Sequence, residues 1–176
     1  MLDALDDDRA RIAIYALRRA LLQMSTTRAL AILRGVPRRR VTVAKEVVRL
    51  LGELQGGVAY ADLLAMAGED VHRDVRVALL RALWDHLERP ETWPALEQAA
   101  TSDDPAIAAG VIRIPADRRS PDTLRRLARL LATLLGHPAP QVRLDTLERC
   151  ATLPITDPDR VLLPPLFQAC GSPHAR

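Results

Sequence analysis

Residues that could carry out acid–base or metal chemistry are few and scattered in this sequence of 176 residues. The histidines, His72, His86, His137 and His174, stand alone, and no His-Glu-x-x-His motif brings two metal ligands onto one helix face. Neither a glycine-rich phosphate loop nor the Gly-x-Ser-x-Gly motif of hydrolases occurs. The sequence therefore predicts a protein that is not an enzyme and that has no cofactor and no metal site.

The cysteines also have a simple structural interpretation. Cys150 falls at an apolar helix position, which predicts a buried thiol rather than a nucleophile. Neither Cys150 nor Cys170 belongs to a Cys-x-x-Cys pair, so we expect a reducing, cytoplasmic setting.

The composition favours helices. Hydrophobic residues make up 48% of the chain and aromatic residues 3%, so the core must consist of Leu, Ala, Val and Ile.

We expect a soluble protein with no membrane partner, because no run of 18 uncharged apolar residues occurs and the N-terminus is acidic. The net charge of +3 suggests an anionic partner, but Lys45 is the single lysine among 25 basic residues. Such arginine usage is typical of a GC-rich genome and is weak evidence for nucleic-acid binding.

An apolar pattern repeats along the chain. The stretch VRVALLRALW at 75–84 has counterparts at 9–17, 43–52, 107–114 and 142–151. The aligned apolar residues are spaced by 34, 32, 32 and 35 residues, and they are Ile14, Val48, Leu80, Ile112 and Leu147. Five amphipathic helices at nearly constant spacing predict a repeat architecture.

Second apolar segments lie at about 26–34, 58–67, 90–100, 121–136 and 157–170, so each repeat is predicted to be a helical hairpin. Capping residues followed by proline at 102–105, 120–122 and 157–159 predict helix starts. Glycines are expected where helices end, at Gly56-Gly57, Gly68, Gly136 and Gly171. Pro115 is expected to end the helix of 107–114 early.

The segment from Asp74-Val75-Arg76 to Ala82-Leu83 resembles the second helix of a HEAT repeat. As a pattern the resemblance covers nearly the whole chain, and it implies an all-α fold, a right-handed α-α superhelix (solenoid) of about five HEAT-like helical hairpins. Residues 1–176 would be a single array and a segment of a longer chain. The arginine of the pattern recurs at Arg143 and is alanine at 10, 44 and 108. In the family it commonly pairs with an aspartate of a neighbouring repeat, so the resemblance implies an incomplete ladder here.

Stacked second helices would bring equivalent positions together on the inner, concave layer. The position after the aligned apolar residue, with Lys45 one turn earlier, gives Tyr15, Lys45, Arg49, Arg81, Arg113 and Glu148. Three arginines in a row would suit an acidic peptide or a phosphate backbone. The alternative is a solvated face on which the arginines pair with Glu46, Glu53 and Asp85.

Arg38, Arg39 and Arg40 precede a helix N-terminus, where the helix dipole favours acidic residues. A bound anion would stabilise this arrangement. The acidic loops 6–8 and 69–70 would do so too, if stacking brings them close, and this structural interpretation is the one that we favour.

HEAT arrays are mostly scaffolds and adaptors, so the resemblance implies a non-enzymatic segment that binds a protein or peptide along its concave face. The alternative is a nucleic-acid-binding helical-repeat protein, DNA glycosylase-like or other, that uses the basic stripe and the tryptophans Trp84 and Trp93. We expect the tryptophans instead to staple the junction between hairpins. The last apolar segment is expected to be uncovered and to allow self-association through Val161, Leu162, Leu166 and Phe167.

Overall fold

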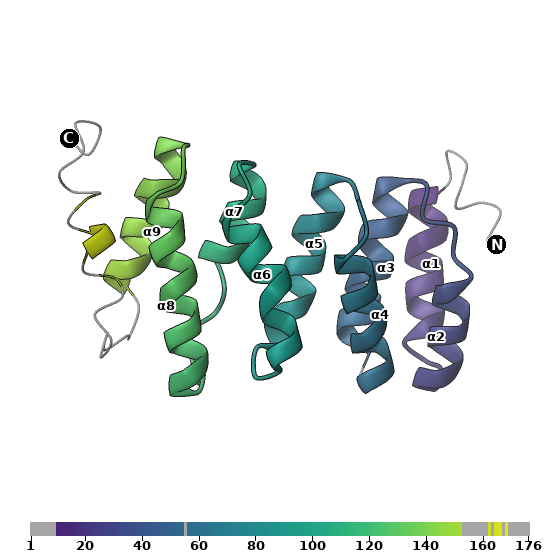
Figure 1. The fold of residues 1–176 in the computed structure, drawn as a ribbon. Helices are drawn as coiled ribbons and strands as arrows, with labels where there is room; N and C mark the ends of the chain where they lie inside the picture. Colours follow the sequence, from purple (N-terminus) through teal and green to yellow (C-terminus); the bar gives the residue numbers. More distant parts are fainter. Residues whose placement is uncertain (1–9, 55, 153–161, 163, 167, 169–176) are drawn as a thin grey trace. The chain divides into compact units, whose positions relative to one another are not determined.

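The computed structural model describes residues 10–54, 56–152, 162, 164–166 and 168 (Figure 1). Over these residues the regular secondary structure is helical and contains no strand, as predicted. The chain divides into two compact units, Met1–Asp85 and His86–Arg176. None of the described helices is long and apolar enough to cross a lipid bilayer.

Unit 1 contains five α-helices within the described residues, and these are α1 (Ala10–Leu21), α2 (Thr26–Arg34), α3 (Val41–Glu53), α4 (Gly57–Ala67) and α5 (Arg73–Leu83). Two short 3-10 turns, η2 (Trp84–His86) and η3 (Pro90–Thr92), follow α5. The α-helices described in unit 2 are α6 (Trp93–Ala100), α7 (Pro105–Ile112), α8 (Pro121–Leu135) and α9 (Pro140–Thr152).

In unit 1 the helices with the repeated pattern form one layer. Helix α3 packs against α1 and α5, and α4 packs across α3 and α5 (Figure 1). The aligned residues Ile14, Val48 and Leu80 all point into the core and are at most 1% exposed. The predicted register of these three helices is therefore confirmed.

Unit 2 has the same alternation. Helix α7 packs against α9, α6 packs against α8, and contacts between α6 and α7 and between α8 and α9 join the two layers. Of the aligned residues here, Ile112 is buried and Leu147 is half-buried. The second apolar segments, which form the first helix of each predicted hairpin, overlap with α2, α4, α6 and α8, whereas most of segment 157–170 lies outside the described residues.

Two of the predicted helix starts have the expected caps. The carboxylate of Asp104 accepts a hydrogen bond from the backbone N–H of Ala106 at 2.8 Å, and the Ser120 hydroxyl accepts one from the N–H of Thr123 at 3.2 Å. Proline occupies the first turn of α7 and of α8, where its missing N–H costs nothing. The third predicted start, at 157–159, lies outside the described residues.

The glycines divide into two groups. Gly68 and Gly136 cap the ends of α4 and α8 as predicted, and Gly171 lies outside the described residues. The prediction for Gly56-Gly57 is wrong, because α3 ends earlier, at Glu53, and Gly56 caps the start of α4. Gly56 has φ of 124°, a conformation that favours glycine over any residue with a side chain.

Helix α7 ends early, as Pro115 predicts. It has 8 residues, whereas α5 has 11 and α9 has 13. After the break the chain stays attached to the unit, because Ile114 is buried and its carbonyl accepts a hydrogen bond from Nη2 of Arg149 on α9 at 2.7 Å.

The arginines of the repeat pattern do not pair with an aspartate as the resemblance implies. Arg76 of α5 donates from Nη1 to the carbonyl of Ala67 and from Nη2 to the carbonyl of Glu69 at 2.7 Å. Arg143 of α9 likewise donates to two carbonyls of the turn after α8, at 2.8 and 2.9 Å. Each guanidinium group binds carbonyl groups at or just after the end of the preceding helix and so braces its own hairpin. We call these contacts the turn braces.

The predicted exposure of the last apolar segment is wrong for Leu162, which is 6% exposed. Leu166 is half-buried, and its N–H donates to the carbonyl of Leu162 at 3.0 Å. The apolar Leu162 side chain is shielded from water within the chain itself, as the hydrophobic effect favours. Val161 and Phe167 lie outside the described residues.

Candidate functional site

Three of the predicted binding residues form a row on the outside of the α1–α3–α5 layer. Tyr15 is 51% exposed, and Arg49 and Arg81 are exposed as well. Each follows a buried residue at an equivalent position of its helix, and the three helices pack side by side. Unit 1 therefore presents Tyr15, Arg49 and Arg81 to solvent together, and we call them the second-helix row.

The charges near the row are mixed. Lys45 is half-buried, and its Nζ lies 3.7 Å from a carboxylate oxygen of Asp74 on α5. Nη1 of Arg49 lies 3.4 Å from Oε2 of Glu46, one of the partners expected for a solvated face. Arg81 forms no ion pair with Asp85 or with any other described residue. Lys45 and Arg49 thus each have an acidic neighbour, whereas Arg81 does not among the described residues.

A buried carboxylate supports the row. Glu46 is 5% exposed, and its Oε1 accepts a hydrogen bond from Nη1 of Arg18 at 2.7 Å. Nη2 of Arg18 also binds the carboxylate of Glu53 at 2.5 and 2.8 Å. The hydrogen bonds with Glu46 and then Glu53 hold the pKa of Arg18 above its ordinary value. Arg18 thereby ties α1 to α3 and fixes the spacing between the two helices that carry Tyr15 and Arg49.

Unit 2 carries the remaining two residues of the predicted stripe. Arg113 is exposed and caps the end of α7, so it lies one residue beyond the helix. Glu148 is exposed on α9, which packs against α7. No ion pair of Arg113 or Glu148 is present among the residues that the structure describes.

The predicted anion site faces acidic residues. Arg40 is exposed at the N-cap of α3, while Arg38 and Arg39 line a cavity of about 270 Å³ together with Glu69 and Asp70 of the α4–α5 turn. This is the juxtaposition that the structural interpretation predicts for loop 69–70. The other acidic loop, 6–8, lies outside the described residues.

A second cavity of about 220 Å³ adjoins the first, between α2 and α4. At its rim, Arg34 forms a bidentate ion pair with Asp62 at 2.9 and 3.0 Å. Arg38, Met66 and Glu69 line both cavities, so the two cavities are neighbours. We call the two together the α4 groove, and each cavity a lobe of it.

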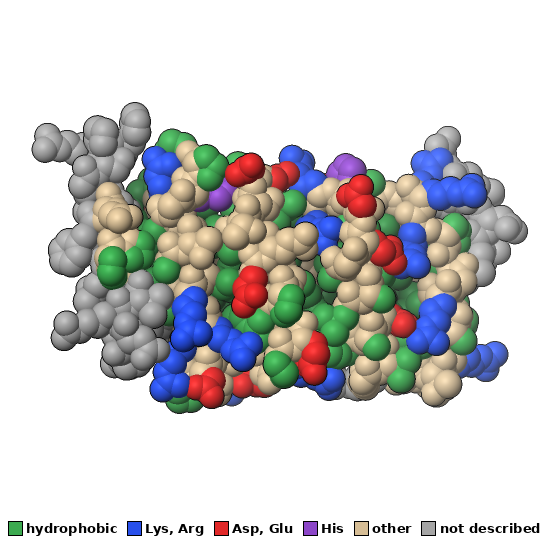
Figure 2. All heavy atoms as spheres, viewed as in Figure 1, with side chains coloured by type: hydrophobic (Ala, Val, Ile, Leu, Met, Phe, Trp, Pro, Cys, Tyr) green, Lys and Arg blue, Asp and Glu red, His purple; other side chains and the backbone are tan. Residues whose placement is uncertain are grey.

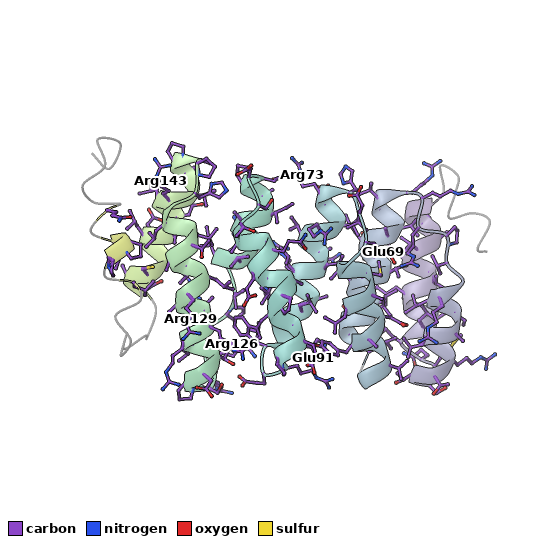
Figure 3. All side chains as sticks on the ribbon, in the orientation of Figure 1. Glu69, Arg73, Glu91, Arg126, Arg129 and Arg143 are labelled. Carbon is purple, nitrogen blue, oxygen red and sulfur yellow. The ribbon has the colours of Figure 1, made fainter. Side chains whose placement is uncertain are left out.

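Helix α8, which does not carry the repeated pattern, has a basic surface. Arg125, Arg126 and Arg129 are exposed there, and Figure 2 shows basic side chains gathered over one end of this helix. Arg125 pairs with Asp122, and the guanidinium of Arg126 lies 5.5 Å from the ring centre of Trp93. Figure 3 labels Arg126 and Arg129, which lie one turn apart on α8. The signal in the sequence was an Arg-Arg-x-x-Arg spacing between leucines.

The tryptophans and Cys150, which the sequence also offers as candidates for binding or chemistry, lie at buried or half-buried positions. Trp93 is buried and its Nε1 donates to the carbonyl of Leu87 at 3.0 Å, which ties the start of α6 to the segment just before it. Trp84 is half-buried. Cys150 is half-buried rather than fully buried, and this burial raises the pKa of its thiol. Within the described residues, His, Cys, Asp and Glu form no group of three or more that could hold a metal ion.

The chain was also compared with known protein families, curated proteins and solved structures, and it matches none of them.

Proposed function

We propose that this chain is a non-enzymatic helical-repeat scaffold of the HEAT type that binds a protein or peptide along the concave face of a right-handed superhelix. The observation that carries the proposal is the second-helix row. Equivalent positions on three adjacent helices present Tyr15, Arg49 and Arg81 to solvent. Tyrosine and arginine are, together with tryptophan, the residue types enriched in binding hot spots.

The mixed charge around the row supports a protein partner over a nucleic acid. Lys45 and Arg49 each have an acidic neighbour, at 3.7 and 3.4 Å. A phosphate backbone is bound best by unpaired positive charges, whose counterions are released on binding. A protein surface, in contrast, offers charges of both signs to a mixed surface.

Site-specific photocrosslinking tests the proposal. The photoreactive residue p-benzoylphenylalanine is placed at Tyr15, Arg49 or Arg81 in cells that express the chain natively. Matched controls carry it at Arg28 on α2 and at Ala61 on α4, which are exposed positions outside the row. We expect the three row positions to capture the same protein and the two controls to capture none of it. Equal capture at row and control positions would contradict the proposal.

The nucleic-acid alternative is tested with the purified chain. Binding of single-stranded and duplex DNA is measured by fluorescence anisotropy between 50 and 200 mM salt, for the wild type and for a variant with Arg49, Arg81 and Arg113 all replaced by alanine. We expect no DNA binding at physiological salt. Tight binding that weakens steeply with salt, and that the triple variant lacks, would replace our proposal with the nucleic-acid function.

A further inference from the structure

The α4 groove lies on a different side of α3 from the second-helix row. Val47 and Leu51 of α3 line the groove, whereas Arg49 lies two residues from each of them. Two residues along an α-helix correspond to a rotation of about 200°, so Arg49 points away from the groove. A ligand in the groove would therefore leave the row free.

The floor of the groove is apolar. In the lobe between α2 and α4 it is formed by Leu33, Val47, Leu51 and Met66, and Ala65 lies at its edge. Floor residues of the lobe between the two turns include Val41, Ala44 and Val75. An apolar side chain that enters such a floor leaves water, which favours binding, and the flexible Met66 shared by both lobes can adapt to its shape.

The walls of the groove carry opposite charges that are not paired with each other. Arg38 lies on the turn after α2, and Glu69 and Asp70 lie on the turn after α4; Figure 3 labels Glu69. In the described part of the chain, the side chains of Arg38, Glu69 and Asp70 form no ion pair. The nearby Arg34 and Asp62, by comparison, close into a bidentate pair. The groove thus separates a free positive wall from a free negative wall across an apolar floor.

We propose that the α4 groove binds a short extended segment of a partner protein in which a leucine-sized apolar side chain has an acidic and a basic residue beside it. The acidic side chain pairs with Arg38, the basic side chain pairs with Glu69 and Asp70, and the apolar side chain rests on Met66. Two neighbouring cavities of about 220 and 270 Å³ accommodate more than one side chain, which favours a peptide segment over a single anion. The inference does not depend on the second-helix row.

Nuclear magnetic resonance titration with blocked tetrapeptides tests the proposal. The probes are acetyl-Lys-Ala-Leu-Glu-amide and acetyl-Glu-Leu-Ala-Lys-amide, which cover both chain directions. We expect one of them to shift the backbone amide signals of residues 35–40 and 62–72, with a dissociation constant on the order of 1 mM, as is reasonable for so short a ligand. Replacing leucine by glycine in that peptide should weaken binding at least about tenfold, because the buried apolar side chain is lost.

Matched variants locate the site. Ala65→Trp fills the lobe between α2 and α4 and should abolish binding, whereas Arg28→Trp, at an exposed position of α2 away from the groove, should leave it unchanged. Arg38→Ala and Glu69→Gln should each weaken binding by about three- to tenfold, since each removes one charged contact. The control Arg28→Ala should have no effect. Circular dichroism verifies that every variant is folded.

Several results would overturn the inference. One is the absence of shifts at residues 35–40 and 62–72 with either peptide. Another is an equal effect of Ala65→Trp and Arg28→Trp. The same shifts with inorganic phosphate alone would reveal an anion site, and equal affinity for free leucine would reveal a site for small amphoteric molecules.

Discussion

The buried carboxylate of Glu46 makes the stability of unit 1 sensitive to its partner Arg18. In the variant Arg18→Met the apolar part of the side chain remains, but the carboxylate, which is 5% exposed in the wild type, loses a hydrogen bond of 2.7 Å. The remaining partner, Arg49, lies 3.4 Å away and its side chain is 62% exposed, so it replaces Arg18 only in part. A carboxylate that is buried without a close cation destabilises the folded state.

The size of the effect follows from burial and distance. Breaking a fully buried ion pair by removing one partner costs about 3–5 kcal/mol. The Arg18 side chain is 28% exposed and Arg49 supplies some compensation, so we expect Arg18→Met to lower the free energy of unfolding by about 2–3 kcal/mol. Glu46→Leu removes the buried charge itself and should cost about 1 kcal/mol, and the double variant should also cost only about 1 kcal/mol. The two single effects are therefore expected to be non-additive by about 2 kcal/mol.

Urea unfolding followed by circular dichroism at 222 nm measures these differences, provided that the slope of the free energy against urea concentration is the same for all variants. Arg28→Met is the matched control, because Arg28 is exposed on α2, and it should change stability by less than about 0.5 kcal/mol. Our reasoning would be refuted if Arg18→Met cost no more than Arg28→Met, or if the effects of Arg18→Met and Glu46→Leu were simply additive.

Three further predictions concern other contacts. A Cβ atom at Gly52 would lie 3.0 Å from Cβ of Ala82, so Gly52→Val should destabilise the protein by about 1–3 kcal/mol in urea unfolding; the second change Ala82→Gly should restore part of this loss, and no restoration would argue against a steric cause. Ser120→Ala removes the cap of α8 and should cost about 1 kcal/mol at pH 7. The Ser120 hydroxyl donates to Glu88 at 2.8 Å and holds the pKa of Glu88 below its ordinary value of 4.5. The stabilisation by Glu88 is complete above that value and is lost as the pH falls below it. The cost of Ser120→Ala should therefore shrink on acidification. Burial raises the pKa of the Cys150 thiol, so this thiol should react with a disulfide reagent at pH 8 more slowly in the folded protein than in the urea-unfolded protein. The measurement uses a variant in which the other cysteine is replaced by serine, and equal rates would contradict the prediction.

The helices were predictable because the spacing of apolar residues depends only on local geometry. An apolar residue at every third or fourth position forms one face of a helix, and Ile14, Val48 and Leu80 are indeed buried. Glu46 was not predictable in the same way, since a glutamate on a helix is expected to be solvated. It is buried because Arg18, which is 28 residues away in the sequence, reaches its carboxylate. Such a pair depends on how the helices stack, and the periodicity of a single helix gives no information on stacking.

The candidate surfaces likewise differ in how far the sequence predicts them. The outward position of Tyr15, Arg49 and Arg81 follows from the repeat alignment alone. The α4 groove requires that residues 35–40 and 68–72, the turns of two successive hairpins, lie close together, and its cavities and unpaired charges depend on side-chain positions. The arginines of α8 are visible in the sequence, but α8 does not carry the repeated pattern, which lies on α1, α3, α5, α7 and α9.

The turn braces have a consequence for the mechanics of the chain. Arg76 ties the α4–α5 hairpin and Arg143 ties the α8–α9 hairpin, whereas Ala44 and Ala108 occupy the corresponding positions of α3 and α7 and have no guanidinium group to donate. We therefore expect one stiffer and one more compliant hairpin among those described in each unit. When the two ends of the protein are pulled apart in an optical trap, we expect α2–α3 and α6–α7 to open at lower force than α4–α5 and α8–α9, so the elasticity of the chain is set by the residue that follows the first apolar position of each second helix.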